Sequence, residues 1–366
     1  MPTTDALDSP DMLVIGLGTA GRAVLDAAYA VGVQAIGVDQ SRLSTDVSPN
    51  LAFDVTRAWG VFSDGTVVLA GPTVRWPCKP KAIVVATGSL DLPLPMPGWE
   101  LDGVTGAHHA RERLPDGARV VVIRGPHAGL GNRQPDLSMF QVIADRDVAG
   151  DAPVTIIGDG HVEAVVIGDD QLETSYVLLD NGLQPENILA RMAGVPNLFS
   201  AAAGGDVIVP GAVFATGGAL LSLVGDAAGI HSDRERVVRD AAETGQVLAE
   251  SVLTGHIPVS TISERFAWPA GGAPVLPSQA TFDTLVCPSE GVTVGMVREA
   301  IARGAITVND VKRRTRAAMA TCQGRDCLWT TRAMLAEANR NWETPMTARP
   351  PAVGITLQEL AGIAGD

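Results

Sequence analysis

The chain has 366 residues, of which 46% are hydrophobic and only 4% aromatic, and its formal net charge is −14. This length suits two or three domains rather than one, and the hydrophobic content excludes a disordered chain. The negative charge argues against nucleic acid as a partner, because phosphate binding requires a basic surface.

The chain has no run of eighteen apolar residues and no basic-then-apolar start, so we expect neither a membrane span nor an export signal. Four cysteines in a chain this long do not suggest a disulfide framework, and a reducing cytoplasm is the expected location. Forty glycines, 24 prolines and few aromatic residues favour an α/β protein with short loops and an aliphatic core.

The N-terminal segment is predicted to form a βαβ unit. A strand over 12–15 precedes a helix over 22–30, and a second strand over 33–38 ends at Asp39. Between the first strand and the helix lies the glycine-rich turn Gly16-Leu17-Gly18-Thr19-Ala20-Gly21. A strand, a helix, a second strand and a terminal acid in this order predict a dinucleotide site; the alternative is a purely structural glycine turn.

Each glycine of this turn has a separate task in a dinucleotide site. Gly16 makes the tight bend, Gly18 lets the backbone approach a pyrophosphate, and Gly21 lets the helix pack closely on the strand. The pyrophosphate meets the positive end of the helix, and Asp39 accepts hydrogen bonds from a ribose diol.

Two later segments indicate which dinucleotide is bound. After a predicted hairpin over 58–69, a buried strand ends in Ala86-Thr87-Gly88, and much later a strand stops at Gly225-Asp226-Ala227 and runs into a helix. Here the chain resembles the two-dinucleotide flavoprotein family, which includes thioredoxin reductase-like and disulfide reductase-like enzymes. The resemblance implies that Asp226 binds the ribityl chain or phosphate of FAD. The alternative is two unrelated glycine turns.

The resemblance also implies a domain plan with a discontinuous α/β core. A FAD-binding Rossmann-like domain takes residues 1–104 and 205–260, and a degenerate NAD(P)-binding-like domain over 105–204 is nested within it. Only 47 positions separate Asp39 from Ala86, fewer than the family normally uses. FAD is therefore held differently, exposed or absent. Cys78 is isolated and no Cys-x-x-Cys occurs, which excludes thiol–disulfide exchange of the thioredoxin reductase type.

The nested domain departs from the family pattern. Its strand over 118–123 leads to Arg124-Gly125-Pro126-His127-Ala128-Gly129-Leu130-Gly131, with Ile123 or Arg124 in place of the first glycine. A bulky side chain there obstructs a pyrophosphate, so we do not expect NAD(P) to bind. Arg124 and Arg133 bind another phosphate or are surface charges.

The histidines give no metal site. His108 and His109 are expected next to each other on a helix, on different faces, so a shared metal is not expected. His231 either approaches a flavin or, in the more ordinary role, caps a helix or lies at the surface.

The C-terminal third is predicted to be a small helical module. Two helical patterns over 293–304 and 307–319 begin with threonine caps. Cys287 precedes them, and Cys322 and Cys327 follow. This arrangement resembles the bacterioferritin-associated-ferredoxin-like (BFD-like) [2Fe-2S] module, here expected over 278–345 and followed by a tail over 346–366.

Within that module, the segment from Thr315 to Cys327 resembles the corresponding segment of one flavoprotein group. The group comprises the α-type subunits of opine oxidases, of hydroxyproline and proline dehydrogenases, of hydrogen cyanide synthase and of heteromeric sarcosine oxidase; the tail over 347–361 looks like theirs too. One position departs, because Ser289 falls where the module has its second cysteine. Two-iron clusters are held by four thiolates, so either a cluster is bound by the incomplete ligand set with Ser289 at the fourth position, or helix packing alone maintains the module.

The resemblance implies an α-type subunit that carries electrons or supports a complex. A FAD-containing β subunit of the D-amino-acid-oxidase-like type would oxidise the C–N bond, and a small ferredoxin-like subunit can accompany it. This chain would bind FAD or another adenine nucleotide, and no residue stands out as catalytic. Two alternatives remain, a self-contained NAD(P)H-dependent flavin or ferredoxin reductase and a non-catalytic scaffold subunit.

Overall fold

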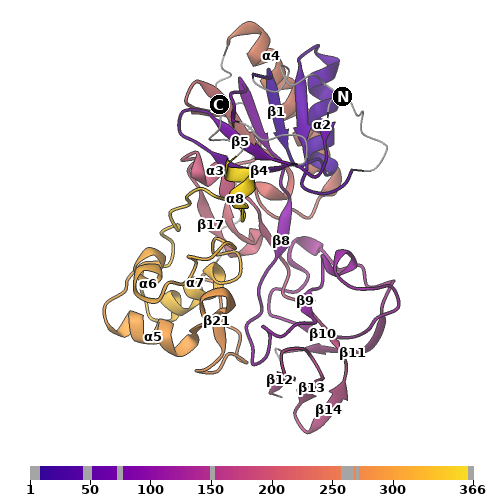
Figure 1. Ribbon diagram of the computed structural model, residues 1–366, viewed down its shortest axis with the longest axis vertical. Coiled ribbons are helices and arrows are strands. Elements are labelled where there is room, and N and C mark those ends of the chain that lie inside the picture. The colour runs from indigo at the N-terminus through magenta and orange to yellow at the C-terminus, as the bar shows by residue number, and fades with distance from the viewer. Residues whose placement is uncertain are drawn as a thin grey trace.

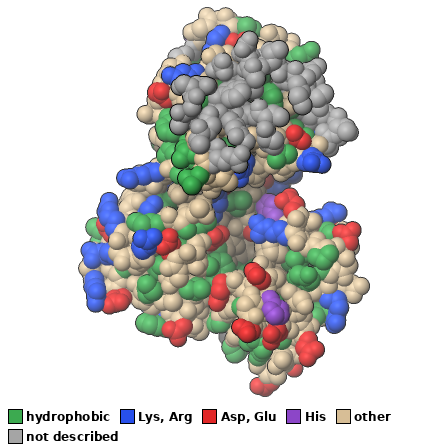
Figure 2. All heavy atoms as spheres, viewed as in Figure 1, with side chains coloured by type: hydrophobic (Ala, Val, Ile, Leu, Met, Phe, Trp, Pro, Cys, Tyr) green, Lys and Arg blue, Asp and Glu red, His purple; other side chains and the backbone are tan. Residues whose placement is uncertain are grey.

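The protein is described by a computed structural model that covers residues 9–43, 52–71, 77–148, 153–256, 268 and 272–361. It has three lobes (Figure 1). The first lobe contains β1, α2 and α4, the nested lobe contains β9 to β14, and the C-terminal lobe contains α5 to α7. Figure 2 shows that the surface is hollowed between the nested lobe and the C-terminal lobe.

A six-stranded sheet forms the centre of the first lobe. Its order is β19 (Phe214–Thr216), β20 (Ala219–Leu223), β7 (Ala82–Val85), β1 (Met12–Ile15), β2 (Ala35–Val38) and β3 (Ala52–Phe53). All pairs are parallel except β19 with β20. The four-residue apolar strands β1, β2 and β7 are buried along their whole length, as expected of parallel strands covered on both faces. Because β20 pairs with β7, two distant parts of the chain share one sheet.

Helices cover one face of this sheet and a small antiparallel sheet covers the other. On the first face α2 (Thr19–Ala30) packs against α4 (Arg234–Thr254). The second face is covered by α3 (Ile188–Met192) and by the three-stranded sheet of β4 (Arg57–Val61), β5 (Val67–Ala70) and β6 (Pro77–Cys78). The hairpin expected over 58–69 is thus β4 and β5.

One expectation about this lobe needs correction. The Gly225-Asp226 turn does not run directly into a helix. It forms a short 3-10 turn, η4 (Gly225–Ala227), and α4 begins only at Arg234, where Asp233 accepts a hydrogen bond from the N–H of Arg236.

The nested lobe is built almost entirely from strands. A parallel sheet has the order β11 (Gln141–Asp147), β10 (Arg119–Arg124), β15 (Tyr176–Asp180) and β9 (Val104–Gly106), and an antiparallel sheet is made of β12 (Val154–Ile157), β13 (Ala164–Ile167) and β14 (Asp170–Glu173). Between β9 and β15 the only helical elements among the described residues are the 3-10 turns η1 (Ala110–Glu112) and η2 (Leu130–Asn132). The helix expected at His108 and His109 is therefore wrong; they lie in a turn that precedes η1.

The nested lobe is joined to the first lobe by two antiparallel strands, β8 (Ser89–Asp91) and β16 (Leu183–Pro185). After α3 the chain forms the short pair β17 (Leu198–Ser200) and β18 (Gly205–Val207), with the 3-10 turn η3 (Ala201–Ala203) between them. This segment leads back to β19 and β20, which completes the first lobe.

The C-terminal lobe has its own apolar core around three helices. It contains the strands β21 (Leu285–Cys287) and β22 (Val292–Thr293), the 3-10 turn η6 (Pro288–Glu290), and the helices α5 (Val294–Ala302), α6 (Val308–Thr315) and α7 (Leu328–Glu337). Both threonine caps are present, and Thr307 forms a capping box with Asp310. The second helix ends at Thr315, earlier than expected, because Arg316 adopts a left-handed conformation.

After α7 the chain returns to the first lobe. Val353 and Ile355 pack against the β4–β5 pair, and Glu359 of α8 (Leu357–Ala361) forms an ion pair with Arg57 of β4. Within the described residues, no helix is long and apolar enough to cross a membrane.

Candidate functional site

The glycine-rich turn has the geometry that close packing and an exposed backbone require. Gly16 has a φ of +97°, and a Cβ on Gly21 would lie 1.9 Å from the carbonyl oxygen of Gly16. A Cβ on Gly18 would meet nothing within 4 Å. Gly16 and Gly21 are thus required by the fold, whereas Gly18 presents its backbone to open space at the N-terminus of α2.

Asp39 supports the same turn from the end of β2. Its Oδ2 accepts a hydrogen bond of 2.6 Å from the backbone N–H of Leu17, and its Oδ1 accepts one of 2.8 Å from that of Ser41. A carboxylate has about four lone-pair sites, so these two bonds leave room for a ribose hydroxyl. The acid lies where a ribose acceptor is expected.

The Gly225-Asp226 turn reaches the same place from far along the chain. Gly225 has a φ of +67°, and a Cβ there would lie 2.9 Å from the Cβ of Ala20 in the first turn of α2. Asp226 is therefore next to the helix N-terminus that follows Gly18. Ala227 is fully buried behind the turn.

The Ala86-Thr87-Gly88 segment forms a third side of this place. A Cβ on Gly16 would lie 2.4 Å from the carbonyl oxygen of Ala86. The Thr87 hydroxyl donates to the carbonyl oxygen of Glu186, and Gly88, with a φ of +73°, faces open space. The structure therefore brings together the three segments 16–21, 86–88 and 225–227.

A residue whose role the sequence did not specify also lies here. The Nη2 of Arg133 is 2.7 Å and 2.9 Å from the two carboxylate oxygens of Asp226, and Arg234 approaches the same carboxylate at 3.5 Å. Burial lowers the pKa of Arg133, and Asp226 opposes this shift. The Nε of Arg133 is buried and has no hydrogen-bond partner among the described residues. Two cations beside a helix N-terminus favour a phosphate-bearing ligand.

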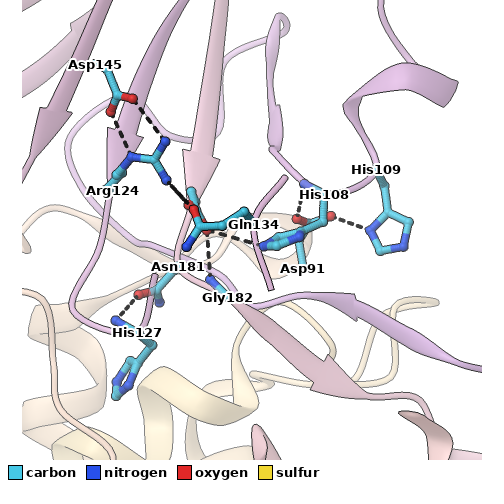
Figure 3. Close-up of polar contacts among 10 residues, drawn as sticks. Asp91, His108, His109, Arg124, His127, Gln134, Asp145, Asn181 and Gly182 are labelled. Carbon is cyan, nitrogen blue, oxygen red and sulfur yellow. Dashed lines mark hydrogen bonds and ion pairs between the residues drawn. The ribbon is translucent and has the colours of Figure 1, made fainter. Parts of the chain in front are cut away.

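In the nested lobe, Arg124 stands at the end of β10, where a second nucleotide turn would have its first glycine (Figure 3). Its guanidinium binds Asp145 with two hydrogen bonds of 2.8 Å and 2.9 Å and contacts the fully buried Asp180 at 2.5 Å. The bond to Asp145 is the main reason that the pKa of Arg124 is raised. Dinucleotides bind at the carboxyl ends of parallel strands, and here these ends, on β10, β11 and β15, are joined by a salt-bridge network.

The paired histidines reach different acids. His108 approaches Asp180 at 3.3 Å, while Nδ1 of His109 lies 2.6 Å from Oδ2 of Asp91. The hydrogen bond with Asp91 raises the pKa of His109 despite its partial burial. His231 accepts a hydrogen bond of 2.9 Å from the backbone N–H of Asp233, so it supports the residue that caps α4 and is not the cap itself.

The predicted cluster ligands are gathered in the C-terminal lobe. Cys287 and Cys327 are fully buried and share a hydrogen bond, which lowers the pKa of Cys287 to about 6 and raises that of Cys327 well above its ordinary value. Burial raises the pKa of the Cys322 thiol, whose Sγ lies 4.0 Å from Oγ of Ser289.

The ligand set is one thiolate short. Cys78 is buried in the core of the first lobe, apart from the other three cysteines. In the described chain no group of three or more His, Cys, Asp or Glu residues is arranged to hold a metal ion. The residues present thus do not make the four-thiolate site of a two-iron cluster.

Comparisons with known proteins match nearly the whole chain. A family model described as "BFD-like [2Fe-2S] binding domain" matches residues 285–337. The A subunit of opine oxidase from Rhizobium meliloti (strain 1021) is 26% identical over 402 residues, which cover 89% of this chain and 86% of that protein. The corresponding opine oxidase chain of Agrobacterium tumefaciens (strain Ach5) is 26% identical over 465 residues, 98% of this chain and 92% of that protein.

A solved structure shows a similar fold. The crystal structure of L-proline dehydrogenase from P. horikoshii aligns with a TM-score of 0.71 and 17% identity, over 96% of this chain and 79% of that chain. Together these findings confirm the fold class and the family resemblance predicted from the sequence. They also support a [2Fe-2S]-type module at the C-terminus, although its ligand set is incomplete.

Proposed function

We propose that this chain is the α-type subunit of a heteromeric flavin-dependent oxidoreductase that acts on the C–N bond of an amino acid, an imino acid or an opine. Substrate oxidation takes place on a partner flavoprotein subunit. The observation that carries the proposal is the convergence of Gly18 and Asp226 on the N-terminus of α2. The similarity to the A subunits of two opine oxidases over most of the chain supports the subunit role.

The residues at this place fit an adenine dinucleotide. The exposed backbone of Gly18 and the N–H groups of Thr19 and Ala20 would hold the diphosphate, because the helix dipole there favours negative charge. Asp39 would accept hydrogen bonds from the hydroxyl groups of the adenosine ribose, and Asp226 would accept them from hydroxyl groups of the ribityl chain. FAD, when bound, supplies reversible transfer of electron pairs.

The chain itself positions and encloses this cofactor. Arg133 connects Asp226 to the nested lobe, so this ion pair fixes the lobe over the turn. Among the described residues named at the turn, Asp39, Asp226 and Arg133 are all engaged by internal partners. They hold the ligand and leave proton transfer from the substrate to the partner subunit.

In this proposal the nested lobe does not bind NAD(P)H, so NAD(P)H is not the electron donor. Arg124 stands where the first glycine of a second nucleotide turn is needed, and its three-way pairing with Asp145 and Asp180 fills the carboxyl ends of the strands. A self-contained NAD(P)H-dependent reductase requires that place for its pyrophosphate.

Absorbance spectra of the purified protein test the proposal. We expect the complex with a D-amino-acid-oxidase-like partner to show more flavin absorbance than the partner alone, and no bleaching of its flavin bands by NADH. Bleaching by NADH without a partner would instead identify a self-contained reductase. A complex with no more flavin than the partner alone, to which this chain contributes none, would leave only the scaffold function.

A further inference from the structure

A separate cavity of about 50 Å³ lies where the β8–β16 connector, the segment around β17 and β18, and the C-terminal lobe meet. None of the glycine-turn residues 16–21 or 225–227 lines it. Its walls come from all three of these parts of the chain, including α7 of the C-terminal lobe.

The unusual feature of this cavity is a buried arginine. Arg332 of α7 is only 1% exposed, and it lies over the ring of Phe199 at 4.7 Å. Its Nη2 is 2.9 Å from Oδ1 of Asp206, yet Nε, Nη1 and Nη2 have no well-formed hydrogen bond among the described residues. Burial lowers the pKa of Arg332 and Asp206 opposes this shift. A guanidinium with unmet donors is costly to bury.

Asp206 does not balance the charge around the cavity. Its carboxylate also faces Arg191, whose Nη1 is 3.3 Å from Oδ2. The remaining two charged residues in the wall, Arg325 and Glu186, form an ion pair with each other. The walls therefore hold three arginines and two acids, which leaves one positive charge uncompensated.

A second unmet donor lines the same cavity. Trp329 lies three residues before Arg332 in α7, so both side chains are on one face of the helix. The indole Nε1 of Trp329 is buried without a hydrogen-bond partner among the described residues. The backbone of Gly205, with a φ of +131°, lies against the ring: a Cβ there would be 3.6 Å from it.

These donors define the class of ligand. The cavity offers the planar fork of Arg332 and one indole N–H, and an arginine fork matches a carboxylate with two parallel hydrogen bonds. A volume of about 50 Å³ has room for only a few atoms, since a single water-sized sphere occupies roughly 10–15 Å³. We propose that this cavity binds the carboxylate group of a small organic acid.

Acetate titration of the full-length protein tests the proposal. We expect a calorimetric binding isotherm and a saturating rise in Tm with sodium acetate, and neither with sodium chloride at equal ionic strength. Arg332→Met should weaken acetate binding about tenfold to hundredfold, as expected for a charge-assisted hydrogen bond. Its flavin content should not change, because the cavity is separate from the glycine turn.

Two further variants keep the test decisive. Trp329→Phe retains an aromatic ring but removes the N–H, so it should weaken acetate binding even if Arg332→Met does not fold. Arg303→Met, at an exposed arginine that follows α5 and pairs with Glu299, is the matched control and should bind acetate as the wild type does. An equal response to chloride, or unchanged acetate binding in Trp329→Phe and in any folded Arg332→Met, would overturn the proposal.

Discussion

Replacing Gly18 by alanine should weaken the proposed ligand contact while leaving the stability of the fold nearly unchanged. Gly18 has φ −67° and ψ −168°, a conformation that alanine adopts without strain, and the added Cβ meets nothing within 4 Å. The free energy of unfolding should change by no more than about 0.5 kcal/mol. The methyl group, however, enters the space assigned to the diphosphate. Overpacking there costs about 1–3 kcal/mol, which weakens FAD binding about fivefold to 150-fold.

Gly21→Ala is the matched contrast within the same turn. Its Cβ would lie 1.9 Å from the carbonyl oxygen of Gly16 and 3.3 Å from the Cβ of Ala86. Since backbone must move to accept it, we expect a loss of about 1–3 kcal/mol in unfolding free energy together with a loss of flavin. Urea denaturation measures stability, and quenching of flavin fluorescence on titration of the apoprotein measures affinity.

Two results would refute this reasoning. Wild-type FAD affinity in Gly18→Ala would show that no diphosphate approaches this backbone. A loss of stability in Gly18→Ala as large as that in Gly21→Ala would show that Gly18 is needed for packing, not for a ligand.

Other parts of the chain give three further predictions. Arg124→Met should lower the free energy of unfolding in urea by about 3 kcal/mol, because it leaves the buried Asp180 without its cation; a loss below about 1 kcal/mol would contradict the network in the nested lobe. Ser289→Cys should increase the iron and sulfide content by adding a fourth thiolate, and unchanged analyses would show that the module is maintained by packing alone. His109→Gln tests the ion pair with Asp91. Because the folded pKa of His109 is raised, its stabilising effect is fully present below about pH 6.5 and is lost as pH rises through the raised pKa. The difference in unfolding free energy between wild type and variant should therefore shrink with rising pH. A difference that grows with pH would contradict the raised pKa of His109.

Local patterns in the sequence predicted much of the first and last lobes. The order of strand, glycine turn, helix and acid around Gly16 and Asp39 depends on neighbours in the chain, and so do the caps at Thr293 and Thr307. The pairing of β20 with β7 was accessible only through the family resemblance, because nothing local connects residues so far apart.

The remaining features arise from contacts between distant side chains. The sequence predicts Arg133 as either a phosphate ligand or a surface charge, yet it pairs with Asp226 across 93 positions. The sequence gives no signal for a buried Arg332, because an arginine in a helical pattern ordinarily lies in solvent. Its burial follows from the contacts of α7 with β18. The helix expected near His108 does not form, because hydrogen bonds of His108 and His109 with the Asp91 carboxylate hold these residues in a turn.

The most direct test of the account is the number of adenine nucleotides released from the purified complex by denaturation and counted by chromatography. Our account predicts two per pair of this chain with its flavoprotein partner, one bound by each subunit. In a complex carrying Gly18→Val the number should fall to one. Equal numbers in the wild-type and variant complexes would contradict the assignment of a nucleotide to the glycine turn and Asp226.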